Sequence, residues 1–190
     1  ILLVDDSEDM LVLLVGYLQQ CGYSDTLTAQ SAIEAFDQLK HAQSADNPAS
    51  GVELILMDIN MHGMDGIEAC RKIKNEMGYP EIPVIMVTGV DDADHLKRAF
   101  DAGAMDYVNK PVNKLELQVR VRSALVLKNA MDLQKRANAQ LAEKNDQLQE
   151  ALDNVKVLRG LLPICAGCKK IKDDAGYWSG IESYISQHSE

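Results

Sequence analysis

Short apolar runs and amphipathic stretches alternate from the first residue of the chain to about Lys110. Short apolar runs bounded by polar residues are typical of buried strands, and apolar residues at helical spacing are typical of helices. Their regular alternation predicts an α/β fold, a doubly wound parallel sheet with helices on both faces. We expect strands near 1–5, 25–29, 53–58, 82–88 and 105–109, and helices at 8–21, 31–41, 65–77 and 92–102.

The helix predicted at 31–41 follows Ser31, whose hydroxyl is suited to cap its first turn. Its apolar residues Ile33, Phe36 and Leu39 recur at near-helical spacing. The sequence therefore predicts an amphipathic helix here.

After Asn113 the apolar positions change to the seven-residue repeat of a coiled coil. The repeat comprises Leu127, Leu141, Leu148, Val155 and Leu162, with Met131 and Leu152 at the alternate seam position. We predict one helix from Leu115 to Leu162, the last helix of the domain continuing into a coiled coil. Gly160 and Pro163 are expected to end it.

The coiled-coil register is imperfect, because Gln134 falls at a d position and Asn138 and Asn145 fall at a positions. Asparagine at a weakens a coiled coil but favours a parallel two-stranded one, since the two amides can pair across the axis. The sequence therefore predicts a parallel homodimer. Two alternatives stay open: a long helix that folds back on the domain, and a partly frayed, solvated helix.

Length and charge narrow the class of protein. The 190 residues allow one domain with a substantial core plus something smaller, and the formal net charge is −10 at pH 7. Without a basic stripe, this charge argues against binding to nucleic acid or to anionic membrane. No apolar run approaches the roughly 20 residues needed to cross a bilayer.

The four cysteines form no secreted disulfide framework, so we expect a cytoplasmic protein.

Polar groups of complementary chemistry stand where the apolar runs end. They are Asp5 and Asp6 after the first run, Asp58 after the third, Thr88 after the fourth and Lys110 after the last. The carboxyl ends of parallel strands open on one crevice, so we expect three carboxylates, a hydroxyl and an ammonium to meet there. This combination predicts a phosphoryl-transfer site.

Asp58 is the predicted phosphoryl acceptor, because a carboxylate can attack a phosphoryl group in line. Three neighbouring carboxylates repel one another and the incoming phosphate, and a divalent cation removes both problems. Mg²⁺ suits such a site, since it prefers octahedral oxygen coordination and keeps several waters. Lys110 can place its charge on the transferring oxygens, and the Thr88 hydroxyl can donate a hydrogen bond to the product phosphate.

Taken together, these segments resemble the receiver domain of bacterial two-component response regulators over about residues 1–125. The resemblance rests on Leu3-Val4-Asp5-Asp6, on Met57-Asp58-Ile59-Asn60-Met61 with Met64-Asp65-Gly66, on Val87-Thr88-Gly89, and on Tyr107-Val108-Asn109-Lys110-Pro111. It implies a flavodoxin-like, five-stranded parallel sheet in the order 2-1-3-4-5.

The resemblance also implies roles for single residues. Asp58 would accept the phosphoryl group from a cognate histidine kinase or phosphotransfer protein. Mg²⁺ would be bound by Asp6, Asp58 and the Asn60 carbonyl, and by Asp5 through a water. Thr88 and Lys110 would contact the phosphoryl group.

Two residues depart from the family pattern. His62 stands where proline is common, and Gly89 stands where a small residue such as alanine is usual. Gly89 would loosen the loop after the fourth strand. His62 would add a titrating group near the mouth of the site, the alternative being a solvated loop histidine.

A phosphorylated acceptor is expected to draw Thr88 inward and to leave space for an aromatic ring. By the resemblance Tyr107 is that switch residue, the alternative being a tyrosine packed on the sheet edge in every state. The Lys110-Pro111 bond is a candidate cis peptide. The signal would leave through the helix at 92–102, the last strand and the final helix, and reach the coiled coil.

The tail holds Cys165 and Cys168 at the Cys-x-x-Cys spacing of half a zinc site. It also resembles a short module found after coiled coils in bacterial signalling proteins, where a second cysteine pair follows, so we expect a truncated Zn²⁺-binding module. His188, or the thiolates of a second chain, would complete the ligands. A redox dithiol and two plain reduced cysteines are the alternatives.

The sequence thus predicts a receiver domain at 1–125, a coiled-coil helix at 126–162 and a cysteine-containing tail at 163–190. The predicted function is that of a response regulator, a phospho-accepting module and not a turnover enzyme. One rival is a Mg²⁺-dependent aspartate-nucleophile phosphatase, which usually needs a second acid where this chain has Asn60. The other is a non-phosphorylated dimerisation scaffold, which the intact acid cluster argues against.

Overall fold

The computed structural model describes residues 1–44, 51–89, 93–159, 164–172, 177–180 and 182–183. The chain divides into two compact units, Ile1–Leu133 and Gln134–Glu190. The domain boundaries expected after residues 125 and 162 stay predictions.

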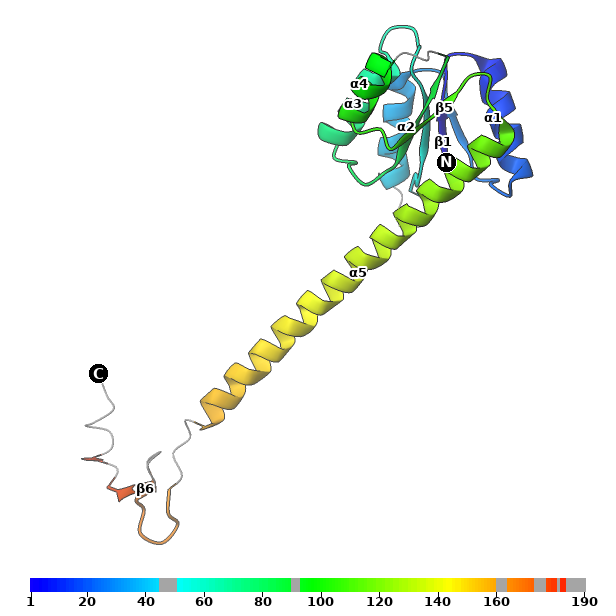
Figure 1. The fold of residues 1–190 in the computed structure, drawn as a ribbon. Helices are drawn as coiled ribbons and strands as arrows, with labels where there is room; N and C mark the ends of the chain where they lie inside the picture. Colours follow the sequence, from blue (N-terminus) through cyan, green and yellow to red (C-terminus); the bar gives the residue numbers. More distant parts are fainter. Residues whose placement is uncertain (45–50, 90–92, 160–163, 173–176, 181, 184–190) are drawn as a thin grey trace. The chain divides into compact units, whose positions relative to one another are not determined.

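A parallel sheet of five strands in the order β2-β1-β3-β4-β5 forms the first unit (Figure 1). Its strands are β1 (Leu2–Val4), β2 (Leu27–Ala29), β3 (Ile55–Asp58), β4 (Val84–Thr88) and β5 (Asp106–Asn109). The helices are α1 (Glu8–Gln20), α2 (Ala32–Ser44), α3 (Gly66–Asn75), α4 (Ala93–Asp101) and α5 (Lys114–Arg159). The predicted α/β fold and its strand order are therefore confirmed.

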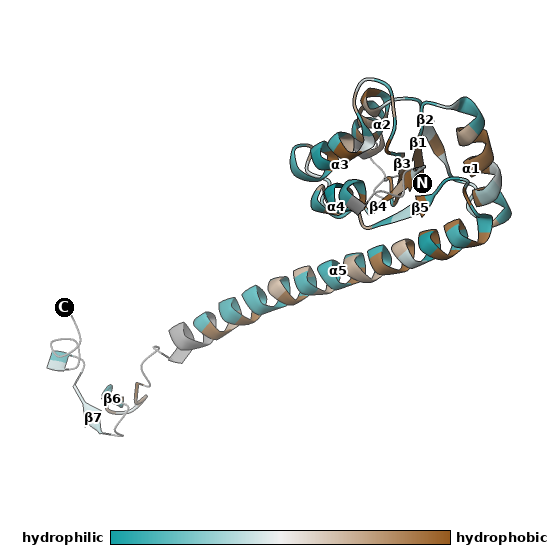
Figure 2. Ribbon diagram, turned by 45° about the horizontal axis from the view of Figure 1, so that its top comes forward, coloured by the Kyte–Doolittle hydropathy of each residue, from teal (hydrophilic) through white to brown (hydrophobic). Residues whose placement is uncertain are grey.

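Apolar side chains on successive strand positions pack against opposite faces of the sheet. Leu2 and Val4 pack with α2, α3 and α4, whereas Leu3 packs with α1 and the first turns of α5. Figure 2 shows the hydrophobic strands enclosed between these two helical layers. Because both faces are buried, the strands read as continuous apolar runs, and polar residues are left to the strand ends.

Side-chain caps fix where the helices begin. The Ser7 hydroxyl accepts from the Met10 amide at 3.4 Å, and the Asp65 carboxylate accepts from the Glu68 amide at 2.7 Å. The Ser31 hydroxyl accepts from the Glu34 amide at 3.2 Å, as the predicted cap requires.

On α2, Phe36 and Leu39 pack against the core as the predicted amphipathic helix requires, but Ile33 does not. Ile33 is 67% exposed, whereas Ala32, Ala35 and Leu39 are buried against the sheet. These three residues lie one and two turns apart on a single stripe, and the small alanines let the helix lie close to the strands. Ile33 falls outside this stripe.

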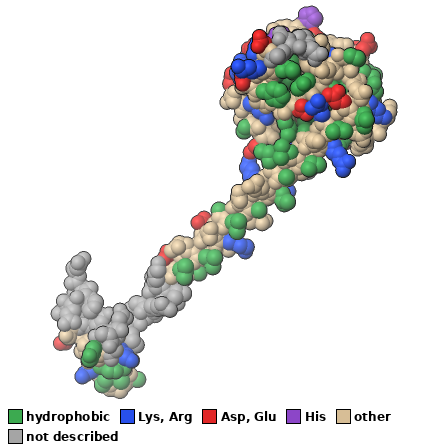
Figure 3. Space-filling model, in the orientation of Figure 1, with side chains coloured by type: hydrophobic (Ala, Val, Ile, Leu, Met, Phe, Trp, Pro, Cys, Tyr) green, Lys and Arg blue, Asp and Glu red, His purple; other side chains and the backbone are tan. Residues whose placement is uncertain are grey.

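α5 is one helix across the boundary of the two units. In the first unit Leu117, Val121 and Ala124 are buried. Beyond Leu133 the described side chains of α5 are exposed, including Leu141 and Leu148 at 62% each. Figure 3 shows hydrophobic side chains at intervals along this surface.

The long helix fits the predicted coiled coil, with some of the predicted residues undescribed. The helix begins at Lys114, one residue before the predicted start. The predicted end at Gly160 and Pro163 lies outside the described residues, as does Leu162. The side chain of Val155 is also not described.

The second unit also holds a short antiparallel pair, β6 (Ile171–Lys172) and β7 (Trp178–Ser179), with a bridge between Ile164 and Ile171. Among the helices described, none is both long and apolar enough to span a membrane.

Candidate functional site

Three carboxylates lie together at the carboxyl edge of the sheet. One oxygen each from Asp5, Asp6 and Asp58 lies within 4.8 Å of the others. The pairing of Val4 with Met57 brings the end of β1 beside the end of β3, so residues that are far apart in sequence meet here. Asp5 is 1% exposed and Asp58 is 3% exposed, while Asp6 lies at the partly open mouth of the cluster.

Lys110 connects two of these carboxylates. Its Nζ donates to Asp5 Oδ2 at 2.9 Å and lies 3.0 Å from Asp58 Oδ2. Its backbone N–H donates to the Thr88 carbonyl at 2.6 Å, and the Lys110-Pro111 peptide bond is cis, as predicted. The turn after β5 therefore delivers the ammonium into the acid cluster.

The electrostatics of the cluster favour an added cation. Burial raises the pKa of the Asp58 carboxyl, the Lys110 hydrogen bond lowers it, and the neighbouring Asp5 charge raises it again, with a net increase. Burial lowers the pKa of the Lys110 ammonium, but Asp5 and Asp58 outweigh this and hold it above its usual value. One ammonium does not balance three carboxylates, and an all-oxygen donor set suits Mg²⁺.

Backbone donors orient the buried acids. The Ser7 amide donates to Asp5 Oδ1 at 2.9 Å, and the Asn60 amide donates to Asp58 Oδ1 at 3.3 Å. The Asn60 side chain itself is exposed. Each of these donors follows its acid by two residues in the loop after the strand.

Gly66 has a role that the sequence reasoning missed. A Cβ at Gly66 would lie 2.0 Å from the Asp58 carbonyl oxygen, and the Gly66 amide donates to the Ile59 carbonyl at 2.9 Å. The start of α3 therefore lies directly against the backbone of the predicted acceptor. Asp65 and Gly66 belong to the sequence motif on which the family resemblance rests. That motif does not predict how closely Gly66 approaches the Asp58 carbonyl.

Thr88 and Tyr107 lie on neighbouring strands. Thr88 is fully buried at the end of β4, where it pairs in register with Asn109 of β5. The half-buried Tyr107 ring meets the Phe100 ring of α4 edge to face at 6.3 Å, and the Arg120 guanidinium of α5 lies 5.4 Å from its centre. Tyr107 therefore contacts both helices beside β5.

Arg120 is a second residue that the sequence reasoning missed. Its Nη1 donates to both oxygens of Asp106 at 2.6 and 2.7 Å, and its Nε donates to Glu116 at 3.0 Å. The hydrogen bonds that it donates to Asp106 raise the pKa of the Arg120 guanidinium above its usual value. This residue ties α5 to β5 next to Tyr107.

His62 reaches Asp6 from the loop between β3 and α3. Its Nδ1 lies 2.5 Å from Asp6 Oδ2, and its backbone N–H donates to the same oxygen at 3.0 Å. Although the His62 side chain is 99% exposed, it contacts the cluster, and these hydrogen bonds lower the pKa of the Asp6 carboxyl.

Cys165 and Cys168 lie in the second unit. The Cys168 amide lies 3.5 Å from Cys165 Sγ, and backbone hydrogen bonds from this turn lower the pKa of the Cys165 thiol. Among the described residues, the only group of three or more metal-ligating side chains is the aspartate cluster. His188 lies outside the described residues. The zinc prediction is therefore not supported, because a structural zinc site needs four ligands and two thiols are found.

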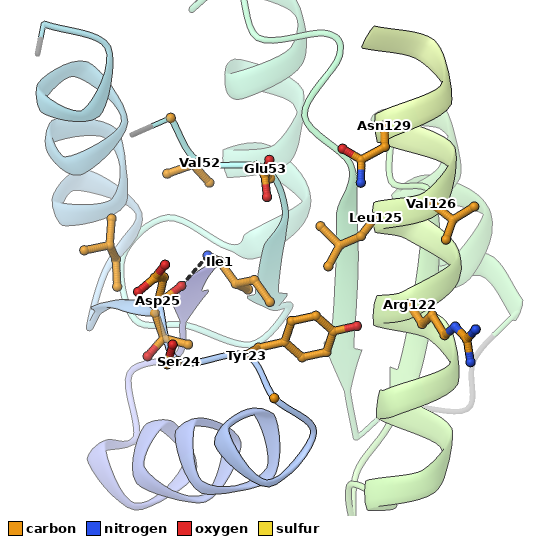
Figure 4. Close-up of a pocket in the computed structure, with 14 residues that line it drawn as sticks. Ile1, Tyr23, Ser24, Asp25, Val52, Glu53, Arg122, Leu125, Val126 and Asn129 are labelled. Atoms are coloured by element: carbon orange, nitrogen blue, oxygen red, sulfur yellow. Dashed lines mark hydrogen bonds between the residues drawn. The ribbon is translucent and has the colours of Figure 1, made fainter. Parts of the chain in front are cut away.

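A cavity of about 930 Å³ opens at the end of the sheet opposite to the acid cluster (Figure 4). It is lined by the segments that precede β2 and β3 and by one side of α5. The amino group of Ile1 donates to the Asp25 carbonyl at 2.8 Å on its wall, and Tyr23 and Leu125 also line it. It lies at the amino ends of the strands, so it is separate from the acid cluster.

Known proteins with similar sequences include response regulators, in agreement with these features of the site. A family model described as response regulator receiver domain matches residues 1–122. Transcriptional regulatory protein YvrH of Bacillus subtilis is 39% identical over 126 residues, which cover 66% of this chain and 48% of YvrH. A chemotaxis protein CheY homolog of Campylobacter jejuni is 30% identical over 125 residues, which cover 66% of this chain and 91% of that protein.

Solved structures agree with the sequence matches. A CheY-like response regulator receiver domain protein from Methanospirillum hungatei superposes with a TM-score of 0.59 at 27% identity, over 68% of this chain and 95% of that one. The chain spans about half the length of YvrH, so the activity of a longer relative is not transferred to it. The matched residues contain the sheet and the whole acid cluster. This chain belongs to the response regulator receiver domain family of two-component systems.

Proposed function

We propose that this chain is a phospho-accepting switch in which Asp58 takes a phosphoryl group from a histidine kinase or phosphotransfer protein. The observation that carries this proposal is the convergence of Asp5, Asp6, Asp58 and Lys110 at one strand edge. Attack by an Asp58 oxygen forms an acyl phosphate bond while the bond from phosphorus to the donor histidine breaks. Asp58 is held for this by the Asn60 amide and by Lys110.

The proposed cation ligands are Asp58, Asp6 and the Asn60 carbonyl, with Asp5 acting through a water. When bound, Mg²⁺ would neutralise the carboxylates and the incoming phosphoryl oxygens. Lys110 would then exchange part of its contact with Asp58 for the transferred oxygens. The Thr88 hydroxyl would donate to the phosphoryl group from the end of β4.

We propose that Tyr107 reports the state of Asp58. Phosphorylation adds about −1.5 to −2 charges and strong acceptor oxygens, which draw Thr88 inward and leave space for the ring. Support comes from the contacts of Tyr107 with Phe100 on α4 and Arg120 on α5. A ring that moves must change both contacts, so the face formed by α4, β5 and α5 would change with it.

The proposed output is a change in a parallel coiled-coil dimer. α5 leads without interruption from the Arg120 contact into the exposed seam leucines Leu141 and Leu148. Asn138 and Asn145 would pair across the dimer axis. The net charge of −10 favours output through this dimer over direct contact with nucleic acid. We also propose a cytoplasmic location, since the cysteines of the described residues are unpaired.

Two rival functions are less well supported. An aspartate-nucleophile phosphatase usually needs a second acid two residues after its nucleophile, and this chain has Asn60 at that position, which cannot act as an acid. A scaffold that is never phosphorylated would not need buried carboxylates at a cost in stability.

Beryllofluoride, a phosphoryl mimic, tests the proposal. With Mg²⁺ present, it should saturate the full chain and shift the amide signals of Thr88, Tyr107 and Lys110 in a ¹H–¹⁵N spectrum. Small phosphate esters should show no catalytic turnover. A spectrum unchanged by beryllofluoride and Mg²⁺ would exclude the switch, and repeated turnover of esters would favour the phosphatase.

A further inference from the structure

His62 makes two contacts with a single oxygen of Asp6. Its ring Nδ1 lies 2.5 Å from Asp6 Oδ2, and its own backbone N–H donates to the same atom at 3.0 Å. The two residues are 56 positions apart, so the contact ties the loop after β3 to the loop after β1. No hydrogen bond to Asp6 Oδ1 is found within the described part of the chain.

Asp6 differs from the other two acids in what holds it. Asp5 and Asp58 are buried and are held by Lys110 and by backbone amides. The Asp6 side chain is 25% exposed, and its hydrogen bonds among the described residues come from His62. An aspartate at an open mouth rotates freely unless it is held, and fixing such a side chain on binding costs about 0.5–1.5 kcal/mol.

We propose that His62 is a positioning residue for the cation, holding Asp6 through Oδ2 so that Oδ1 is left as a ligand. This inference rests on the proposed function of the acid cluster. A neutral imidazole with its proton on Nδ1 donates to the carboxylate without adding positive charge beside the cation. Groups that hydrogen-bond to a metal ligand fix its orientation and raise metal affinity by roughly 10–100-fold.

Substitutions at residue 62 can remove the two contacts stepwise. His62→Ala removes the ring contact and keeps the backbone donor. His62→Pro removes both, because proline has no N–H. His62→Asn places an amide donor near the position of Nδ1 and should restore the contact. His41→Ala, which removes an exposed histidine from α2, is the matched control.

The measurement is a titration of the full chain with Mg²⁺ alone, in mildly alkaline buffer without a phosphoryl donor, followed by ¹H–¹⁵N amide shifts. We expect the dissociation constant to rise roughly tenfold in His62→Ala and further in His62→Pro. It should stay within about threefold of the wild-type value in His62→Asn, and be unchanged in His41→Ala. Because residue 62 is exposed, thermal midpoints should stay near that of the wild type.

The outcomes separate this inference from the proposed function. If the wild-type chain shows no saturable shift with Mg²⁺, the cation site and the role of His62 both fail. If the wild-type chain binds Mg²⁺ and the Ala and Pro variants bind as tightly or more tightly, only the role of His62 is overturned. If His62→Asn bound Mg²⁺ as weakly as His62→Ala, the loss of affinity could not be explained by the lost hydrogen bond to Asp6.

Discussion

Asp58 is buried although a carboxylate is more stable in water. It is 3% exposed, and burial and the nearby Asp5 raise its pKa while Lys110 opposes the increase. A carboxyl group with a higher pKa in the folded chain than in the unfolded chain stabilises the fold at low pH, and this contribution is lost as the pH rises through the folded pKa. Ionised Asp58 therefore destabilises the fold at neutral pH.

Asp58→Asn should raise the thermal midpoint at pH 7 without Mg²⁺, by a few degrees for a gain of about 1 kcal/mol. The gain should shrink as the pH falls, because the wild-type carboxyl becomes protonated. Calorimetry over a series of pH values measures it, with Asp101→Asn at the exposed end of α4 as the control. An Asp58 variant that is less stable than the wild type at pH 7 would show that the carboxylate is not strained there.

Gly66→Ala should distort the acid cluster by pushing on the backbone of Asp58 from the start of α3. Its Cβ would meet the Asp58 carbonyl oxygen at 2.0 Å, and this oxygen is a backbone atom of β3 that cannot move aside as a flexible side chain could. We expect a loss of roughly 2–3 kcal/mol in the free energy of unfolding, together with weaker Mg²⁺ binding. Gly51→Ala, where a Cβ meets nothing within 4 Å, should be close to neutral in denaturant unfolding. Equal stability of the two variants would contradict this explanation.

At the residue scale, the sequence predicts which groups converge but not how they touch. Asp5, Asp6, Asp58 and Lys110 could be brought together because parallel strands end at a common edge. The contact of His62 with Asp6 and the clearance at Gly66 depend on the path of the loop after β3. Apolar periodicity does not describe loop paths. The family pattern places His62 near the mouth of the site, but the sequence does not predict its contact with Asp6 or the close approach at Gly66.

At the element scale, β5 is linked to its neighbouring helices through Tyr107. The ring contacts Phe100 on α4 and Arg120 on α5, and Arg120 also pairs with Asp106. The strand and helix positions could be predicted from alternating apolar runs. On α2 the predicted residues Phe36 and Leu39 do pack against the core, whereas Ile33 is exposed because the small residues Ala32 and Ala35 face the sheet.

Arg120→Ala should loosen the link between α5 and β5. It removes the contact of Nη1 with both Asp106 oxygens and the cation above the Tyr107 ring, each worth about 0.5–1 kcal/mol at a partly exposed site. We expect a loss of roughly 1 kcal/mol in urea unfolding and altered Tyr107 ring signals. Arg122→Ala, an exposed arginine on the same helix, should change neither. Unaltered ring signals in the Arg120 variant would disprove the link.

At the scale of the whole molecule, the proposed output depends on pairing with a second copy of this chain. Leu141 and Leu148 are 62% exposed in the single chain, which is the state expected of seam residues before pairing. Heptad spacing predicts the seam from sequence, and the long helix fits that prediction, but the pairing of two chains stays a prediction. The cysteine tail was less predictable, because two thiols do not determine which other ligands, if any, complete a site.

Leu141→Lys should dissociate the proposed dimer, because it places a charge in the apolar seam. The control is Leu133→Lys, an exposed leucine on the same helix but off the seam, with 69% exposure compared with 62% for Leu141. Sedimentation should show a dimer for the wild type and the Leu133 variant, and at least a tenfold weaker dimer for the Leu141 variant. A wild-type chain that is monomeric with and without beryllofluoride would rule the dimer out.

Phosphoryl transfer to Asp58 is tested most directly by intact-mass measurement after incubation with acetyl phosphate and Mg²⁺. The wild-type chain should gain the mass of one phosphoryl group, and the gain should disappear in Asp58→Asn or when the cation is chelated. An unlabelled wild-type chain, or labelling that persists in Asp58→Asn, would contradict the proposed function.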